Sequence, residues 1–157
     1  MRVHAYAAGT PTASTHPDVD GGTCLRELVV IEAADIAYKV GDGTEIDVEL
    51  TIAEIFDGGP GEVIVHGCRE IMITVDYTGK SVPVRARPSE RLSDVRAQAV
   101  QELVRQHGLD PKQSADLVLR LPGTTAELPE ASPVGAYVAK GTCALTLDLV
   151  HAVRPQG

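Results

Sequence analysis

The segment IMITVDYTGKSVPVRAR, residues 71–87, decides the fold that we expect for this sequence. Residues 71–77 are rich in β-branched side chains and predict a strand, and Thr78-Gly79-Lys80 predicts a tight turn. In residues 81–87 apolar residues alternate with other residues, which predicts a second strand. Pro83 is tolerated there only near a sheet edge or at a bulge. The segment therefore predicts a β-hairpin.

A helix is expected directly after the hairpin. Pro88-Ser89-Glu90 has the composition of a helix start, and Gly108 followed by Pro111 marks the end. Between them apolar residues recur at helical spacing, namely Leu92, Val95, Ala99 and Leu103. Such a stripe is typical of a helix face that is buried in a core. The helix is therefore expected to pack against the hairpin.

Two more strands complete the second half. Residues 116–121 and 143–150 have strand patterns, and Pro122-Gly123-Thr124 forms a turn after the first of them. The order is then strand, strand, helix, strand, strand. One helix lying across a mixed sheet, with the first and last strands adjacent and parallel, is the β-grasp arrangement of the α+β class.

The first half predicts a second, degenerate version of the same fold. Strands are expected at residues 3–7, 37–40 and 62–66, a polar loop at 9–22, and a short helix from Thr23, as its cap, through Val29. We therefore expect tandem β-grasp domains at residues 1–68 and 69–150, followed by a flexible tail at 151–157. The linker is very short, which limits how the two domains can be oriented.

Composition and charge exclude several classes of function. Hydrophobic residues make up 43% of the 157 residues and charged residues 23%, which is ordinary for a globular protein with a real core. A formal net charge of −8 argues against nucleic acid and acidic membranes as partners, because both are bound through Lys and Arg. Neither a signal peptide nor a segment able to span a bilayer is recognisable, so we expect a cytoplasmic protein.

The three cysteines, Cys24, Cys68 and Cys143, are odd in number and far apart in the sequence. They form no CxxC or Cys/His cluster, so we expect neither a disulfide framework nor a zinc site. Cys68 and Cys143 are expected to be small buried side chains at strand ends. His4 and His66 lie on predicted neighbouring strands, but two histidines alone do not make a metal site. We expect a reducing compartment, no metal and no cofactor.

From residue 71 to the end, the chain resembles ubiquitin. The resemblance rests on PSERLSDVR at 88–96, HGLDP at 107–111, LVL at 117–119 and GTCALTL at 141–147, in the order and near the spacing of that family. The whole chain is similar to a bacterial family of paired ubiquitin-like proteins, encoded beside activating-type, conjugating-type and deubiquitinase-type enzymes in antiphage defence operons. The stretches that carry this second likeness are DVELTIAE at 47–54, VIVHGC at 63–68, LRLPGTT at 119–125 and GTC at 141–143. The layout also resembles the interferon-induced double modifier of vertebrates.

The resemblance implies a modifier that works through its C-terminal glycine. Gly157 would be adenylated by a ubiquitin-activating-type enzyme, passed as a thioester to a conjugating-type enzyme, and joined by an isopeptide bond to a target, with a phage structural protein as one candidate. A deubiquitinase-type metalloprotease would recycle it, and Arg154, Pro155 and Gln156 would contact the activating enzyme. Gly157 suits attack on its carboxylate because glycine has no Cβ. Pro155 and Gln156 depart from the Arg-Gly-Gly ending of ubiquitin.

Val118 aligns with the central residue of the apolar patch through which ubiquitin binds partners, so the resemblance implies a partner-binding patch there. No nucleophile with a base and no cofactor cradle is recognisable in the sequence, so we expect that the chain is not an enzyme. Two alternative functions stay open. One is a sulfur carrier with a C-terminal thiocarboxylate, and the other is a ubiquitin-like scaffold that binds partners without being conjugated.

Overall fold

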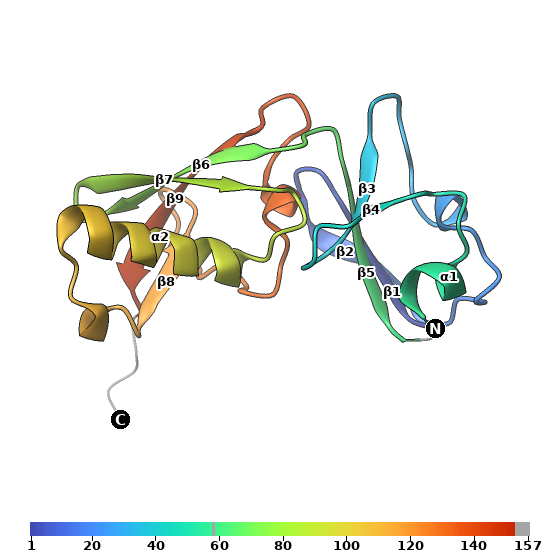
Figure 1. Cartoon of the computed structure of the whole chain (residues 1–157), viewed down its shortest axis with the longest axis horizontal. Coiled ribbons are helices and arrows are strands. Elements are labelled where there is room, and N and C mark those ends of the chain that lie inside the picture. Colours follow the sequence, from blue (N-terminus) through green and yellow to red (C-terminus); the bar gives the residue numbers. More distant parts are fainter. Residues whose placement is uncertain (58, 153–157) are drawn as a thin grey trace.

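The computed structural model describes residues 1–57 and 59–152. It contains two sheets, one in each half of the sequence, and the two halves lie side by side along the long axis of the molecule (Figure 1). Each sheet has its own cluster of buried apolar side chains. The chain crosses from the first sheet to the second between His66 and Ile71.

The C-terminal sheet has four strands in the order β7-β6-β9-β8. The first pair, β6 and β7, is antiparallel, β6 and β9 are parallel, and β8 and β9 are antiparallel. The strands are β6 (Ile71–Tyr77), β7 (Lys80–Ala86), β8 (Leu117–Arg120) and β9 (Ala144–His151). The first and last strands of this half therefore pair in the middle of the sheet, as the sequence predicts.

Helix α2 (Leu92–His107) lies across one face of the C-terminal sheet (Figure 1). The buried side chains of α2 are those of the predicted stripe, namely Leu92, Val95, Ala99 and Leu103. They share one core with inward side chains of all four strands. Gly108 ends the helix with a φ of 68°, a left-handed conformation that a residue without Cβ adopts at little cost. The predicted strand, strand, helix, strand, strand order is confirmed.

The N-terminal sheet repeats this topology. Its order is β2-β1-β5-β3-β4, with β1 antiparallel to β2 and parallel to β5, and β3 antiparallel to β5. The strands are β1 (Val3–Ala7), β2 (Thr10–His16), β3 (Ile36–Lys39), β4 (Glu45–Ile46) and β5 (Gly61–His66). The order β2-β1-β5-β3 corresponds strand for strand to β7-β6-β9-β8. Tandem β-grasp domains of the α+β class are therefore confirmed.

The first half is degenerate because it lacks the long helix. Between β2 and β3 the only helical segment in the described chain is η1 (Leu25–Glu27), a single 3-10 turn. The prediction of a helix from Thr23 through Val29 is wrong. Val29-Val30-Ile31 follows this turn, and consecutive β-branched residues lose side-chain freedom in a helix. A helix is therefore disfavoured where it would have to continue.

The prediction of a polar loop over residues 9–22 is also wrong in part, because residues 10–16 form strand β2. This strand lies at the edge of the sheet, and most of its side chains are exposed. Its sequence, TPTASTH, has no alternation of apolar and polar residues, since neither face has to be buried. Backbone hydrogen bonds to β1 hold the strand in the sheet. Because this pairing does not depend on the side chains, it produces no hydrophobic pattern in the sequence of β2.

Besides η1, three short helical segments of the described residues connect strands. They are α1 (Ile52–Phe56), η2 (Pro111–Gln113) and η3 (Val134–Tyr137). Thr51 caps α1, because its hydroxyl accepts a hydrogen bond from the backbone N–H of Glu54. In η3, Val134, Gly135 and Ala136 are buried, and η3 contacts β1, β2 and β5 of the other half. No helix among the described residues has the length and apolar character needed to cross a membrane.

Candidate functional site

The two halves are packed closely against each other around η3. The backbone N–H of Gly9 donates a hydrogen bond to the carbonyl oxygen of Gly135 at 3.3 Å. A Cβ added at Gly135 would lie 2.8 Å from Pro88 in the same half, and 2.9 Å from both His66 and Ile64 in the other half. Only a residue without a side chain fits at such a distance. The interface is therefore built around this glycine.

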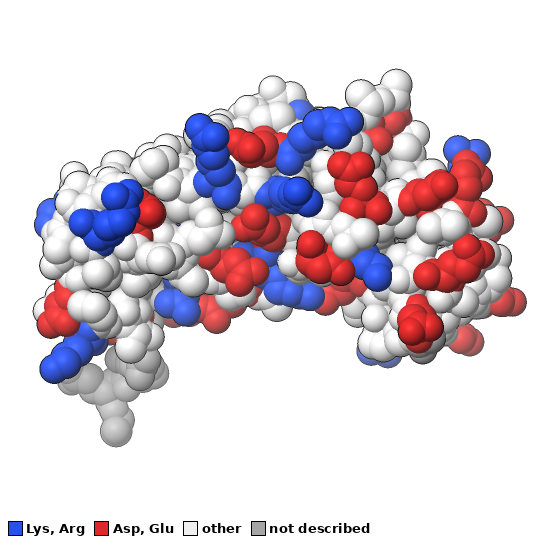
Figure 2. All heavy atoms as spheres, in the orientation of Figure 1, with Lys and Arg blue, Asp and Glu red and all other residues white. Residues whose placement is uncertain are grey.

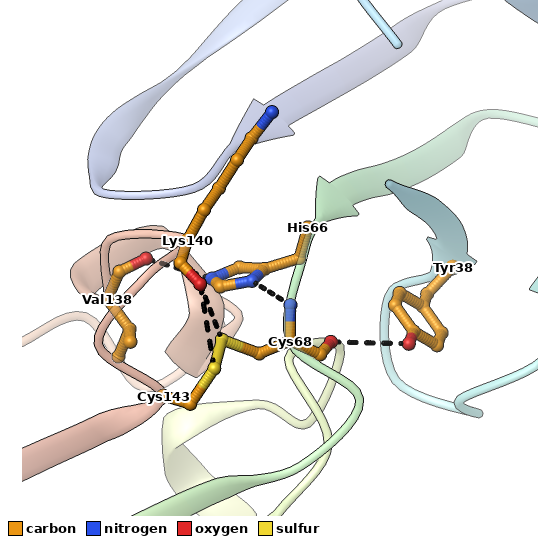
Figure 3. The surroundings of a disulfide bond; sticks show 6 residues. All are labelled: Tyr38, His66, Cys68, Val138, Lys140 and Cys143. Atoms are coloured by element: carbon orange, nitrogen blue, oxygen red, sulfur yellow. Dashed lines mark hydrogen bonds between the residues drawn. A yellow bond between two sulfur atoms is a disulfide. The ribbon is translucent and has the colours of Figure 1, made fainter. Parts of the chain in front are cut away.

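His66 is fully buried at this interface and is hydrogen-bonded on both ring nitrogens (Figure 3). Its Nδ1 accepts from the backbone N–H of Cys68 at 3.0 Å, so Nε2 carries the proton and donates to the carbonyl of Val138 at 2.8 Å. Burial lowers the pKa of His66 below its usual value, because a charged imidazole would lose its hydration there. The neutral ring thus links β5 to the segment after η3.

The ion pairs between the halves follow an uneven distribution of charge. Residues 1–68 contain 3 basic and 12 acidic residues, whereas residues 69–157 contain 11 basic and 10 acidic residues. Figure 2 shows acidic side chains spread over the N-terminal half and basic ones near the middle of the molecule. Four ion pairs of the described residues join the two halves, and in each of them the basic residue comes from the second half. They are Arg69–Glu45, Arg91–Glu62, Lys140–Glu32 and Lys140–Asp35. Opposite net charges therefore favour this packing.

The pair of Lys140 and Asp35 is the most buried of these contacts. The Lys140 Nζ lies 2.6 Å from Oδ2 of Asp35, whose side chain is only 2% exposed. Burial by itself would raise the pKa of the Asp35 carboxyl, but hydrogen bonds from Lys140 and from the backbone N–H of Glu32 outweigh it and lower the pKa. The carboxylate therefore stays charged at the interface.

A disulfide joins Cys68 to Cys143 beside His66 (Figure 3). The expectation of unpaired cysteines is wrong, and the reason lies in the sheet. Because β6 and β9 are parallel neighbours, the residues just before the two strands lie at the same end of the sheet, with Cα atoms 5.7 Å apart. Cys24 is the free cysteine. The pairing removes the basis for expecting a reducing compartment, and the cytoplasmic location stays a prediction.

Val118 lies on the sheet face that points away from α2. The neighbours Leu117 and Leu119 are buried in the core, whereas Val118 is half-buried and lies opposite Val150 of β9, which is half-buried too. Residues directly opposite each other in a ladder share one face, so the two valines form an apolar cross-strand pair. A role of Val118 in binding partners stays a prediction.

Three side chains form a hydrogen-bonded chain at the end of β9. The ring nitrogen Nδ1 of His151 lies 3.0 Å from Oδ1 of Asp116, and Nε2 lies 3.1 Å from the hydroxyl oxygen of Tyr77. We did not predict this group from the sequence, because its members come from separate segments 35 and 74 residues apart. No local pattern could have indicated it.

The residues predicted to form the conjugation tail, Arg154, Pro155, Gln156 and Gly157, lie outside the described residues. The described chain reaches Ala152, whose backbone N–H donates to the carbonyl of Asp116 at 2.8 Å. In the part of the chain that the structure describes, no three His, Cys, Asp or Glu side chains are close enough to hold a metal ion. His4 and His66 lie on the adjacent strands β1 and β5, but His4 is opposite Glu62.

A protein-family model described as BilA ubiquitin-like domain 2 matches residues 72–152, which is just over half of the sequence. The chain belongs to this family. The match includes all of helix α2 and strands β7, β8 and β9, and nearly all of β6. In this BilA-family chain the ubiquitin-like fold expected from the sequence is therefore confirmed for the second half. No curated protein sequence matches the chain.

Solved structures similar to this BilA-family chain include ubiquitin-like ones. A de novo designed protein based on ubiquitin is 21% identical, with a TM-score of 0.40 and coverage of 58% of this chain and 99% of that protein. The UBL domain of Plasmodium falciparum Dsk2 is 19% identical, with a TM-score of 0.39 and coverage of 53% and 99%. An Arabidopsis thaliana protein is 15% identical, with a TM-score of 0.39 and coverage of 57% and 94%. The fold assignment itself rests on the strand order.

Proposed function

We propose that this chain is a ubiquitin-like protein modifier and not an enzyme. A ubiquitin-activating-type enzyme transfers AMP from ATP to the Gly157 carboxylate and releases pyrophosphate, and a cysteine thiol of that enzyme then displaces AMP to form a thioester. A cysteine thiol of a conjugating-type enzyme takes over the glycine by thioester exchange, and an amine of a target protein displaces this thiol to form an isopeptide bond. A deubiquitinase-type metalloprotease releases it. In this proposal residues 1–68 and 69–150 are the two domains, and residues 151–157 are the tail. The setting is antiphage defence in the bacterial cytoplasm, with phage structural proteins as candidate targets.

Membership of the BilA ubiquitin-like family is the observation that carries this proposal. Gly157 stands six positions after His151, the last residue of strand β9. Strand β9 pairs with β6 as far as Asp148 and with β8 as far as His151, so the strand that precedes the tail is held in the sheet. A C-terminal glycine also offers a carboxylate without steric obstruction by a Cβ.

The test is the intact mass of the protein after incubation with the activating-type and conjugating-type enzymes and ATP. Wild type is compared with a variant that lacks Gly157. A thioester or amide adduct that forms only with wild type is the expected result. A thiocarboxylate on Gly157 in place of a protein adduct would favour the sulfur carrier instead. No adduct with either form would refute conjugation.

A second candidate function is a scaffold that binds partners without being conjugated. The observations that favour it are the half-buried apolar pair of Val118 and Val150 and the close packing of the two halves, which presents both sheets in one arrangement. Deleting residues 155–157 distinguishes the two functions. The modifier loses its biological activity in this variant, whereas a scaffold keeps it and would instead lose activity when Val118 is replaced by Asp.

A further inference from the structure

The end of strand β9 extends beyond its pairing with β6. The parallel ladder of β6 and β9 runs from Met72 opposite Ala144 to Asp76 opposite Asp148. The antiparallel ladder with β8 continues to His151, which lies opposite Leu117. Residues 149–151 are therefore paired with β8 alone. A strand end that is paired on one side frays more readily than one paired on both sides.

Side chains replace the missing ladder at this end. The hydroxyl of Tyr77, the last residue of β6, reaches Nε2 of His151, and the two rings meet edge to face with centroids 5.9 Å apart. On the other side Nδ1 of His151 reaches the carboxylate of Asp116, which precedes β8. With the proton on Nδ1, a neutral His151 donates to Asp116 and accepts from Tyr77. His151 thus connects the ends of three strands.

The backbone continues this connection by one residue. The N–H of Ala152 donates to the carbonyl of Asp116 at 2.8 Å, so Asp116 holds both the side chain of residue 151 and the backbone of residue 152. Gly157 lies five positions after Ala152 in the sequence. A fully extended chain spans at most about 3.6 Å per residue, so Gly157 can lie no further than about 18 Å from Ala152. The place where this short tail begins therefore limits which points its end can reach.

We propose that Tyr77, Asp116 and His151 act as positioning residues for the transfer of the tail. We call these three residues the tail-root clamp. The clamp holds Ala152 in place, so the start of the tail lies at a fixed position relative to an enzyme that is bound to the folded domain. This inference rests on the proposed function, because it concerns the delivery of Gly157 to an activating-type enzyme. Pre-organisation of this kind lowers the entropic cost of forming the reactive complex.

The first test needs no enzyme. Amide hydrogen exchange at Ala152 is measured by NMR for wild type, His151→Ala and Tyr77→Phe, with Thr146→Ala as the control because Thr146 is an exposed residue of the same strand. We expect exchange at Ala152 to accelerate at least tenfold in His151→Ala and less in Tyr77→Phe, and to stay unchanged in Thr146→Ala. Equal exchange in wild type and both clamp variants would overturn the proposal.

The second test measures thioester formation with the activating-type enzyme at several modifier concentrations. We expect His151→Ala to raise the KM for the modifier about three- to tenfold with little change in kcat, and His151→Asn to restore part of the loss, since its amide can still donate to Asp116. If His151→Ala fails to fold, Tyr77→Phe is the variant tested. Wild type without any thioester would contradict the modifier function, whereas identical KM values for wild type and clamp variants would contradict only the clamp.

Discussion

Removal of the disulfide between Cys68 and Cys143 is expected to destabilise the protein by about 2 to 4.5 kcal/mol. The bond joins residues 75 positions apart, and closing a loop of that length lowers the entropy of the unfolded chain by about 15 cal/mol/K, or about 4.5 kcal/mol at 25 °C. The losses in stability measured when disulfides are removed are commonly smaller than this entropic value, so we place the lower limit of the expected loss at about 2 kcal/mol. For a chain of this size the melting temperature should fall by about 5 to 15 °C.

The double variant Cys68→Ser/Cys143→Ser isolates the effect of the cross-link. The carbonyl oxygen of Lys140 lies 3.2 Å from Sγ of Cys68 and 3.6 Å from Sγ of Cys143. A serine hydroxyl at either position can donate a hydrogen bond to this oxygen, so the buried polar group is not left without a partner. The loss in stability then reports the cross-link itself and not an unsatisfied hydroxyl.

The assay is thermal unfolding followed by circular dichroism, with and without a phosphine reductant. Thiol titration of the unfolded protein should give one thiol, that of Cys24, before reduction and three after it. Cys24→Ser serves as the control and should keep the melting temperature and its response to reductant. Three thiols in the non-reduced protein, or a fall of less than about 2 °C on reduction, would refute the reasoning.

Three further predictions concern the interface between the halves. The free energy of unfolding should fall as the pH drops below about 6.5, by up to about 1.4 kcal/mol per pH unit, because His66 binds a proton more readily in the unfolded chain than in the buried site. Urea unfolding midpoints measured from pH 7 to 5 should show this slope. The variant His66→Gln should show a weaker dependence on pH. Gly135→Ala should lower the free energy of unfolding by about 1–3 kcal/mol, because the added Cβ would overlap atoms of both halves. Gly141→Ala is the control and should lower it much less in the same urea assay, because no atom lies within 4 Å of its added Cβ. Lys140→Ala should lower the free energy of unfolding by about 1–3 kcal/mol, because it leaves the buried Asp35 carboxylate without its cation. The control Lys112→Ala, at an exposed lysine, should lower it by less than about 0.5 kcal/mol in the same urea assay.

The second half could be predicted well because its signals are local. Strand β6 has the predicted limits, and the stripe on α2 packs into the core as its spacing indicates. Alternation along a strand and a 3.6-residue period along a helix arise from the geometry of a single element. These patterns are readable without knowledge of what the element packs against.

The first half shows where local signals fail. Strand β2 is an exposed edge strand without alternation, and the helix expected after Thr23 is reduced to one 3-10 turn. For the candidate site, Leu117 and Leu119 are buried, whereas Val118 between them is half-buried. The roles of Val118, Arg154, Pro155, Gln156 and Gly157 stay predictions.

The sequence by itself determined the fold class, the tandem organisation, and the four strands and long helix of the second half, because these follow from short-range patterns. Only the tertiary structure decided which distant residues meet. The Cys68–Cys143 bond, the burial of His66 under η3, and the contact of Tyr77 and Asp116 with His151 join residues 35 to 75 positions apart. Such contacts depend on the register of β6, β8 and β9 and on the packing of one half against the other. Strand register is a property of the assembled sheet and not of any single strand, so no single segment reveals these contacts.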